Sequence, residues 1–191
     1  MTENIFENDV KKCVSIIKEH GVILYPTDTI WGLGCDIKNE KAIEKIFKIK
    51  KRDKQKSFVI LMTDVQQLSK YIANPPLEIE TILEQYTEPT TIIYPDAINL
   101  PNALIASDGS IAVRITKDAF CRSLIKRLRS PIVSTSANMS GDESPTFFKK
   151  IKKEIIQSAD YVVKYKQDDE TISLPSSILK YEKDGSFKKL R

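Results

Sequence analysis

The hydrophobic pattern of the chain switches repeatedly between a helical period of about 3.6 residues and short continuous apolar runs. The helical period predicts amphipathic helices over residues 8–19, 40–51 and 118–129, and Asn39 is placed to cap the second of them. Runs of β-branched and aromatic residues predict strands at Val22–Tyr25, Phe58–Met62, Thr90–Tyr94, Ile111–Ile115, Ile132–Ser134, Tyr161–Lys164, Ser177–Leu179 and Phe187–Leu190. This alternation predicts an α/β (α+β) fold in a single domain, residues 1–191, with helices covering a sheet.

Weaker signals fill the remaining segments. A helix capped by Thr63 or Asp64 is expected to run to about Tyr71, and a second one to end near Tyr86 after the interruption at Pro75. Residues 95–104 have the composition of a loop, and a helix is predicted to follow residues 144–146. The polar stretch 166–174 is the best candidate for a mobile loop.

Composition narrows the class of protein. Apolar residues make up 41% and charged residues 29% of the 191 residues, as in globular chains that bury a core. No apolar run approaches the ~20 residues that a membrane-spanning helix needs. The three cysteines lack metal-type spacing and no secretory signal is visible, so we expect a cytoplasmic protein with reduced thiols. A single histidine, His20, argues against His-based metal sites and Ser-His catalysis.

Two strands are followed at once by a polar turn. The first predicted strand breaks at Pro26 into Thr27, Asp28 and Thr29, and the segment 134–141 repeats this arrangement with three hydroxyls, an amide and a final glycine. Such turns present side chains to small ligands, so the pair suggests one shared site. Taken singly, each turn has the alternative interpretation of local hydrogen bonding without a ligand.

The common nucleotide motifs are absent. Gly32 and Gly34 lie two apart, but Ile37 stands where a dinucleotide-binding G-x-G-x-x-G motif needs its third glycine, and no P-loop is present. Net charge is only +4, yet basic residues cluster in residues 45–56 and 122–129. Such clusters suit phosphates, and the alternative for each is a solvated helix face.

Taken together and in this order, these motifs resemble the YrdC-type threonylcarbamoyl-AMP synthases. The resemblance covers nearly the whole chain and is carried by segments 25–34, 50–52, 110–114, 134–141, 144–146 and 175–177. It implies a twisted mixed sheet with a concave, basic cavity. It also implies a nucleotidyltransferase that makes L-threonylcarbamoyl-AMP and pyrophosphate from L-threonine, bicarbonate and ATP, with Mg²⁺ accompanying ATP. The adenylate then serves the tRNA threonylcarbamoyl transferase machinery, which forms N6-threonylcarbamoyladenosine in tRNA.

The resemblance also assigns roles to individual residues. It implies that L-threonine is bound by Thr29, Arg114, Ser136 and Ser176, and that ATP is bound by Arg52, Lys56, Ser110, Asn138, Thr146 and Arg191. It places Lys50 with Arg52 in one basic catalytic unit, and it requires no nucleophilic Ser, Cys or His. On this hypothesis Gly32 and Gly34 let the backbone turn tightly beneath the cavity.

The chain departs from the family pattern at three places. Asp53 replaces a usual proline, Lys56 replaces a small polar residue, and residues 86–91 lack the usual Trp and Gly. Two alternatives to a synthase are a tRNA- or double-stranded-RNA-binding module of this fold without synthase activity, and a carbamoyl-transfer maturation module. Salt-sensitive tRNA binding without turnover would distinguish the first. The second is disfavoured because the accompanying segments of such larger proteins are absent from these 191 residues.

Overall fold

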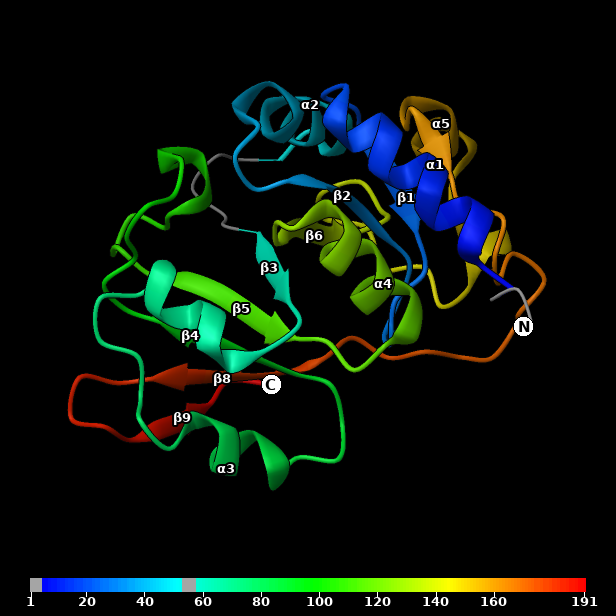
Figure 1. Cartoon of the computed structure of the whole chain (residues 1–191). Helices are drawn as coiled ribbons and strands as arrows, with labels where there is room; N and C mark the ends of the chain where they lie inside the picture. Colours follow the sequence, from blue (N-terminus) through cyan, green and yellow to red (C-terminus); the bar gives the residue numbers. More distant parts are fainter. Residues whose placement is uncertain (1–4, 53–57) are drawn as a thin grey trace.

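In the computed structural model, which describes residues 5–52 and 58–191, all named strands join one mixed sheet (Figure 1). The strand order is β7-β1-β2-β6-β3-β5-β4-β8-β9. Strands β7 and β9, from the C-terminal part of the chain, form the two edges of the sheet. Three neighbouring pairs, β1–β7, β3–β5 and β4–β8, are parallel and the others are antiparallel. The bounds are β1 Ile23–Tyr25, β2 Gly32–Asp36, β3 Val59–Met62, β4 Thr90–Tyr94, β5 Ile111–Ile115, β6 Ile132–Ser136, β7 Tyr161–Val162, β8 Ser177–Tyr181 and β9 Phe187–Lys189. The predicted α/β fold class is confirmed.

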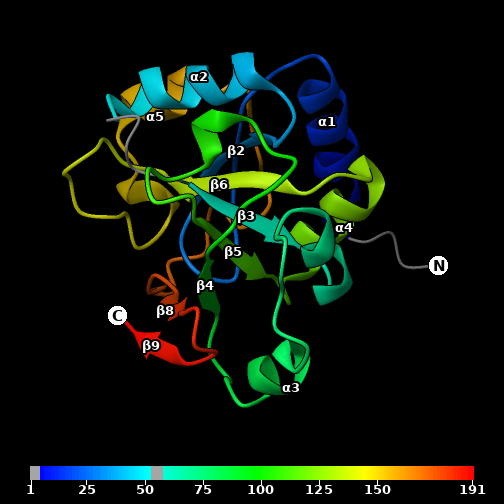
Figure 2. The same ribbon diagram turned by 90° about the vertical axis from the view of Figure 1, so that its left-hand side faces the viewer.

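The long helices gather at the β1–β2–β6 side of the sheet, whereas the short α3 lies near β4, β8 and β9 (Figures 1 and 2). The predicted cap at Asn39 is formed, because its Oδ1 accepts from the Ala42 amide at 3.1 Å, and Asp118 caps α4 in the same way by accepting from the Cys121 amide at 2.8 Å. These bonds fix where two of the helices begin. The helices are α1 Glu7–Lys18, α2 Glu40–Lys50, α3 Ile79–Glu84, α4 Ala119–Leu128 and α5 Lys153–Ser158.

Two predicted helices take a different form. The segment after Asp64 is a 3₁₀ helix, η1 Val65–Lys70, with Asp64 as its cap. Residues 144–146 are not followed directly by an α-helix, because the short 3₁₀ helix η3 Phe148–Lys150 comes before α5. The predicted loop 95–104 contains another 3₁₀ turn, η2 Asn102–Leu104. None of the helices in the described part of the chain combines the length and apolar character needed to span a bilayer.

The expectation that Gly32 and Gly34 form a tight turn is wrong, because both lie in strand β2. Gly34 pairs with Ile23 of β1 and with Ser134 of β6, so the strand is hydrogen-bonded on both sides. A Cβ at Gly34 would lie 2.7 Å from Tyr25 Cε1 and 2.7 Å from the Val133 carbonyl oxygen. The glycine is therefore required by close packing against a neighbouring ring rather than by turn geometry.

Candidate active site

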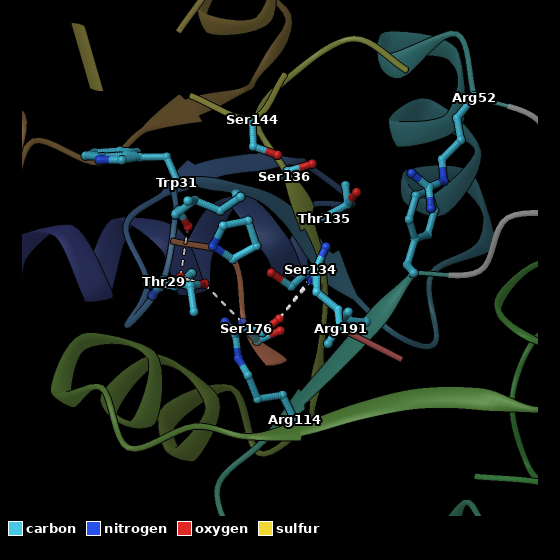
Figure 3. A pocket seen from close by; sticks show the side chains of 16 residues that line it. Thr29, Trp31, Arg52, Arg114, Ser134, Thr135, Ser136, Ser144, Ser176 and Arg191 are labelled. Atoms are coloured by element: carbon cyan, nitrogen blue, oxygen red, sulfur yellow. Dashed lines mark hydrogen bonds between the residues drawn. The ribbon is translucent and has the colours of Figure 1, made fainter. Parts of the chain in front are cut away.

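A cavity of about 210 Å³ opens where the Pro26 turn, β5, β6 and the segment after residue 174 meet (Figure 3). Its lining is rich in hydroxyl groups and in guanidinium groups. No Asp or Glu side chain is found among the described residues that line it. The hydroxyl-bearing residues in the lining are Thr27, Thr29, Ser134, Thr135, Ser136, Ser144 and Ser176, and the arginines are Arg52, Arg114 and Arg191. The cavity is therefore built to receive an anionic, hydrogen-bonding ligand.

Arg114 of β5 is the most buried of the three arginines, at 6% exposure. Its Nη1 donates to Thr29 Oγ1 at 3.0 Å. Its Nη2 lies 3.1 Å from Asp28 Oδ1, an ion pair that lacks hydrogen-bond alignment. Arg114 Nε has no hydrogen-bond partner among the described residues. This Nε is enclosed by protein, and each Nη carries two N–H groups, so Arg114 has cavity-facing donors only among the Nη hydrogens that Thr29 and Asp28 do not use.

Asp28 itself does not line the cavity but supports Arg114 from behind. Its Oδ2 accepts a hydrogen bond from Thr116 Oγ1 at 3.3 Å, and its charge balances the guanidinium. Arg114 is buried and the Asp28 side chain is only 16% exposed, so the pair holds Arg114 in place with limited competition from water.

Thr27 and Thr29 form a directed hydroxyl chain. Thr27 Oγ1 donates to the Ile30 carbonyl oxygen at 2.8 Å and accepts from the Thr29 amide at 3.0 Å. Its single proton is thereby used, so Thr29 is the donor in the 2.9 Å contact between the two hydroxyls. Thr29 Oγ1 also accepts from Arg114, and its remaining lone pair is available to a ligand donor such as an amine.

Lys50, predicted to be catalytic, does not line the cavity but is fully buried behind it. Its Nζ donates to the carbonyl oxygen of Ser136, to the carbonyl oxygen of Asn138 at 2.6 Å and to Asn138 Oδ1 at 3.3 Å. The backbone of Lys50 also accepts a bond from the Ser140 amide at 2.9 Å. Burial, together with the nearby Arg52 cation, lowers the pKa of Lys50 to about 7. The side chain thus ties α2 to the turn after β6.

Arg52, which follows the end of α2, and Arg191 both line the cavity (Figure 3). The Arg52 guanidinium lies 5.3 Å from the centre of the Phe58 ring, and burial lowers its pKa. Arg191 donates through Nε and Nη2 to the Ser176 carbonyl oxygen, at 3.2 and 2.9 Å. Ser176 Oγ in turn contacts Thr91 Oγ1 at 2.8 Å. Arg191 thereby fixes the segment that carries Ser176.

The remaining predicted nucleotide contacts are not in this lining. Ser110 Oγ donates to Asp108 Oδ1 at 2.6 Å, and the Asn138 amide nitrogen donates to the Asp142 carbonyl oxygen at 2.7 Å. Thr146 lies in a second, smaller hollow that shares Thr27, Thr29 and Trp31 with the main cavity. Lys56 lies outside the described residues. The nucleotide roles of these four residues stay predictions.

Several lining residues were not singled out from the sequence. Trp31 follows the polar turn and stacks at a tilt on Phe148, with ring centres 4.7 Å apart. Ser134 and Thr135 belong to the same β6 segment as Ser136, and their hydroxyl-rich run was the available signal. Ser134 Oγ accepts a 2.7 Å hydrogen bond from the hydroxyl of Tyr25, which is fully buried.

Sequence comparison relates the chain to a known family and to named enzymes. Residues 15–191 match the Sua5/YciO/YrdC family model, described as "Telomere recombination". The chain is 31% identical over 146 residues to the threonylcarbamoyl-AMP synthase of Idiomarina loihiensis, covering 75% of this chain and 78% of the relative. It is also 31% identical over 144 residues to the enzyme of that name from Escherichia coli O9:H4, covering 74% of this chain and 76% of the relative.

Solved structures agree in fold. Sua5 of P. abyssi in complex with L-threonine superposes with a TM-score of 0.85 at 23% identity, covering 99% of this chain. The chain spans only about half of that protein, 55% of its length. YciO of E. coli gives a TM-score of 0.84 at 22% identity, covering 99% of this chain and 91% of YciO. The match of the family model over most of the chain shows that this protein belongs to the Sua5/YciO/YrdC family.

Proposed function

We propose that the protein is an L-threonylcarbamoyladenylate synthase, which converts L-threonine, bicarbonate and ATP into L-threonylcarbamoyl-AMP and pyrophosphate. The observation that carries the proposal is the cavity lining, whose described side chains include three arginines and seven hydroxyl-bearing residues but no carboxylate, which suits an amino acid and a triphosphate. The relatives named threonylcarbamoyl-AMP synthase support the same activity. YciO shares the fold as well, so an assay, and not the fold, decides the activity.

The chemistry proceeds in two steps. The threonine amine attacks the carbon of bicarbonate, and loss of water leaves a carbamate. One carbamate oxygen then attacks the α-phosphorus of ATP, and the bond to pyrophosphate breaks. Neither step needs a covalent enzyme intermediate, so the protein contributes positioning and neutralisation of charge.

Threonine is assigned to the Arg114 side of the cavity. Arg114 lines the cavity beside Thr29, and the Nη hydrogens that Thr29 and Asp28 do not use would bind the threonine carboxylate through charge-assisted hydrogen bonds. Ser136 and Ser176, from opposite walls, complete the hydroxyl-lined subsite for the amino acid. The likeness to Sua5 of P. abyssi, solved with L-threonine, is consistent with this assignment.

The triphosphate is assigned to the Arg52 end of the cavity, with Arg191 next to the threonine subsite because its guanidinium bonds the Ser176 carbonyl oxygen. Both guanidinium groups line the cavity, and the two cations would offset the charge that develops as pyrophosphate leaves. Lys56, Ser110, Asn138 and Thr146 remain the predicted further contacts for ATP. Lys50 is assigned a positioning role, because its ammonium group holds the Ser136–Asn138 turn through carbonyl groups.

Mg²⁺ is assigned to the substrate, as part of MgATP. Among the described residues, no group of three or more His, Cys, Asp or Glu side chains is arranged to hold a metal ion. The lining offers donors for phosphate oxygens rather than ligands for a cation. The adenylate product would pass to the tRNA threonylcarbamoyl transferase machinery.

Pyrophosphate release tests the proposal when each substrate is omitted in turn. Purified protein with MgATP, bicarbonate and L-threonine should release pyrophosphate, and leaving out threonine should abolish the release. Arg52→Ala should reduce the rate strongly, whereas the exposed Lys150→Ala serves as the matched control and should not. Folded protein that binds tRNA but releases no threonine-dependent pyrophosphate would contradict the proposal and favour the RNA-binding alternative.

A further inference from the structure

Tyr25 and Ser134 reach each other across an intervening strand. Tyr25 is on β1 and Ser134 on β6, and β2 lies between these two strands. The Tyr25 hydroxyl nevertheless donates to Ser134 Oγ at 2.7 Å. Paired residues share a face of an antiparallel sheet, so Tyr25, Gly32 and Gly34 lie on the face that also carries Ser134.

The spacing of the two glycines explains how the ring crosses β2. Residues two apart in a strand project to the same face, so Gly32 and Gly34 leave that face of β2 without side chains. A Cβ at Gly34 would come within 2.7 Å of Tyr25 Cε1, and one at Gly32 would lie 3.7 Å from the same atom and 3.2 Å from Ser134 Oγ. The two glycines thus leave the space over β2 that the Tyr25 ring occupies.

The hydrogen bond determines where the Ser134 proton points. Tyr25 is fully buried, and burial raises its pKa, so the phenol stays protonated and acts as the donor. Ser134 Oγ has no other hydrogen-bond partner among the described residues. Ser134 also lines the cavity, so its own O–H, which Tyr25 cannot accept while donating, is left for a ligand acceptor.

We propose that Ser134 is a substrate-contacting hydrogen-bond donor for the carbamate made from bicarbonate, and that Tyr25 is a positioning residue that directs the Ser134 proton into the cavity. This inference rests on the proposed function. In the proposed function, guanidinium groups of the lining bind the threonine carboxylate and the phosphates. The hydroxyl of Ser134 is neutral, so it suits the carbonyl-type oxygen of the carbamate, which carries less charge. Of the two carbamate oxygens, one attacks phosphorus and the other keeps its bond to carbon. A neutral donor on the second oxygen orients the group without neutralising the first.

Steady-state kinetics of Ser134→Ala, Tyr25→Phe and the double variant test this inference, with the KM for bicarbonate measured separately from those for threonine and ATP. Loss of one hydrogen bond predicts a bicarbonate KM about five- to tenfold higher in each single variant, with little change for the other two substrates. The double variant should be no worse than Ser134→Ala, because Tyr25 acts only through Ser134. Tyr94→Phe and Ser130→Ala, buried residues outside the lining, are the matched controls.

The outcomes separate this inference from the proposed function. Wild-type protein without threonine-dependent turnover would overturn both. Active wild-type protein whose Ser134→Ala and Tyr25→Phe variants keep the bicarbonate KM of the controls would overturn the inference alone. An equal rise of all three KM values would also overturn it, because that pattern indicates a structural role. Tyr25→Phe preserves the buried ring, so it keeps the test decisive even where Ser134→Ala does not fold.

Discussion

Arg114 Nη1 and Thr29 Oγ1 are joined by a 3.0 Å hydrogen bond although 85 positions separate the two residues in the sequence. The bond connects the middle of the sheet to the turn that ends β1, and Asp28 in the same turn supplies the counter-charge at 3.1 Å. One buried guanidinium therefore positions the turn and also lines the cavity. Because Arg114 has both roles, it is the central residue of the proposed threonine subsite.

Arg114→Lys should weaken threonine binding about 10- to 100-fold, because an ammonium cannot replace the several fixed donors of the guanidinium. Trp31 is the only tryptophan of the sequence and lines the cavity, so its fluorescence reports binding without turnover. Arg127→Lys changes a surface arginine that pairs with Glu7 and is the control. Equal threonine affinities for the two variants would refute the assignment.

Asp28→Asn should destabilise the protein by about 3 kcal/mol, because it leaves the buried Arg114 cation without its counter-charge. Thermal unfolding with and without threonine measures the effect. Threonine should raise the melting temperature of this variant more than that of wild type, since the ligand carboxylate replaces the lost charge. Glu170→Gln breaks an ion pair whose members are both more than half exposed, and should cost little. Similar losses in both variants would contradict the buried-pair interpretation.

Gly34→Ala should destabilise the fold by about 1–3 kcal/mol through overpacking. The added Cβ would lie 2.7 Å from both Tyr25 Cε1 and the Val133 carbonyl oxygen. Gly32→Ala is the matched comparison, because its nearest contacts are 3.1 and 3.2 Å away and the loss should be smaller. Urea denaturation of the two variants measures the difference. If both variants unfold at the wild-type urea midpoint, the Tyr25 ring does not require glycines on this face of β2.

Lys50 should make stability depend on pH above neutrality. Its pKa is about 7 in the folded protein and 10.5 ordinarily, so between these values the unfolded chain binds more protons. The free energy of unfolding therefore gains a contribution that grows as pH rises from about 7 toward 10.5. Lys50→Met removes this contribution. Urea unfolding of the wild type and of Lys50→Met at several pH values in this window gives the free energy of unfolding of each protein as a function of pH. Equal slopes for the two proteins would show that Lys50 does not titrate there.

Local chemistry predicted the elements that depend on local interactions. Strands β4 and β5 match their predicted bounds residue for residue, and Asn39 and Asp64 cap the segments that follow them as expected. Strand β2 was missed because its glycines have the local chemistry of a turn, whereas their strand conformation depends on pairing with β1 and β6 and on space for the Tyr25 ring.

The sequence also predicted part of the candidate site. Motif resemblance selected residues that the fold does gather around the cavity: Thr29, Arg52, Arg114, Ser136, Ser176 and Arg191. It could not reveal that Lys50 is turned away and buried under the Ser136–Asn138 turn, because that depends on how α2 packs against the segment after β6. It also assigned no role to Ser134, although the residue lies in a matching segment, because the proposal for Ser134 depends on its contact with Tyr25 across β2.

The most direct test of the central claim follows the carbon of bicarbonate. Protein is incubated with labelled bicarbonate, L-threonine and MgATP, and the nucleotide products are separated and identified by mass. We expect label in threonylcarbamoyl-AMP, formed in step with pyrophosphate and absent when threonine is omitted. Folded protein that binds threonine but transfers no labelled carbon to an adenylate would contradict the account.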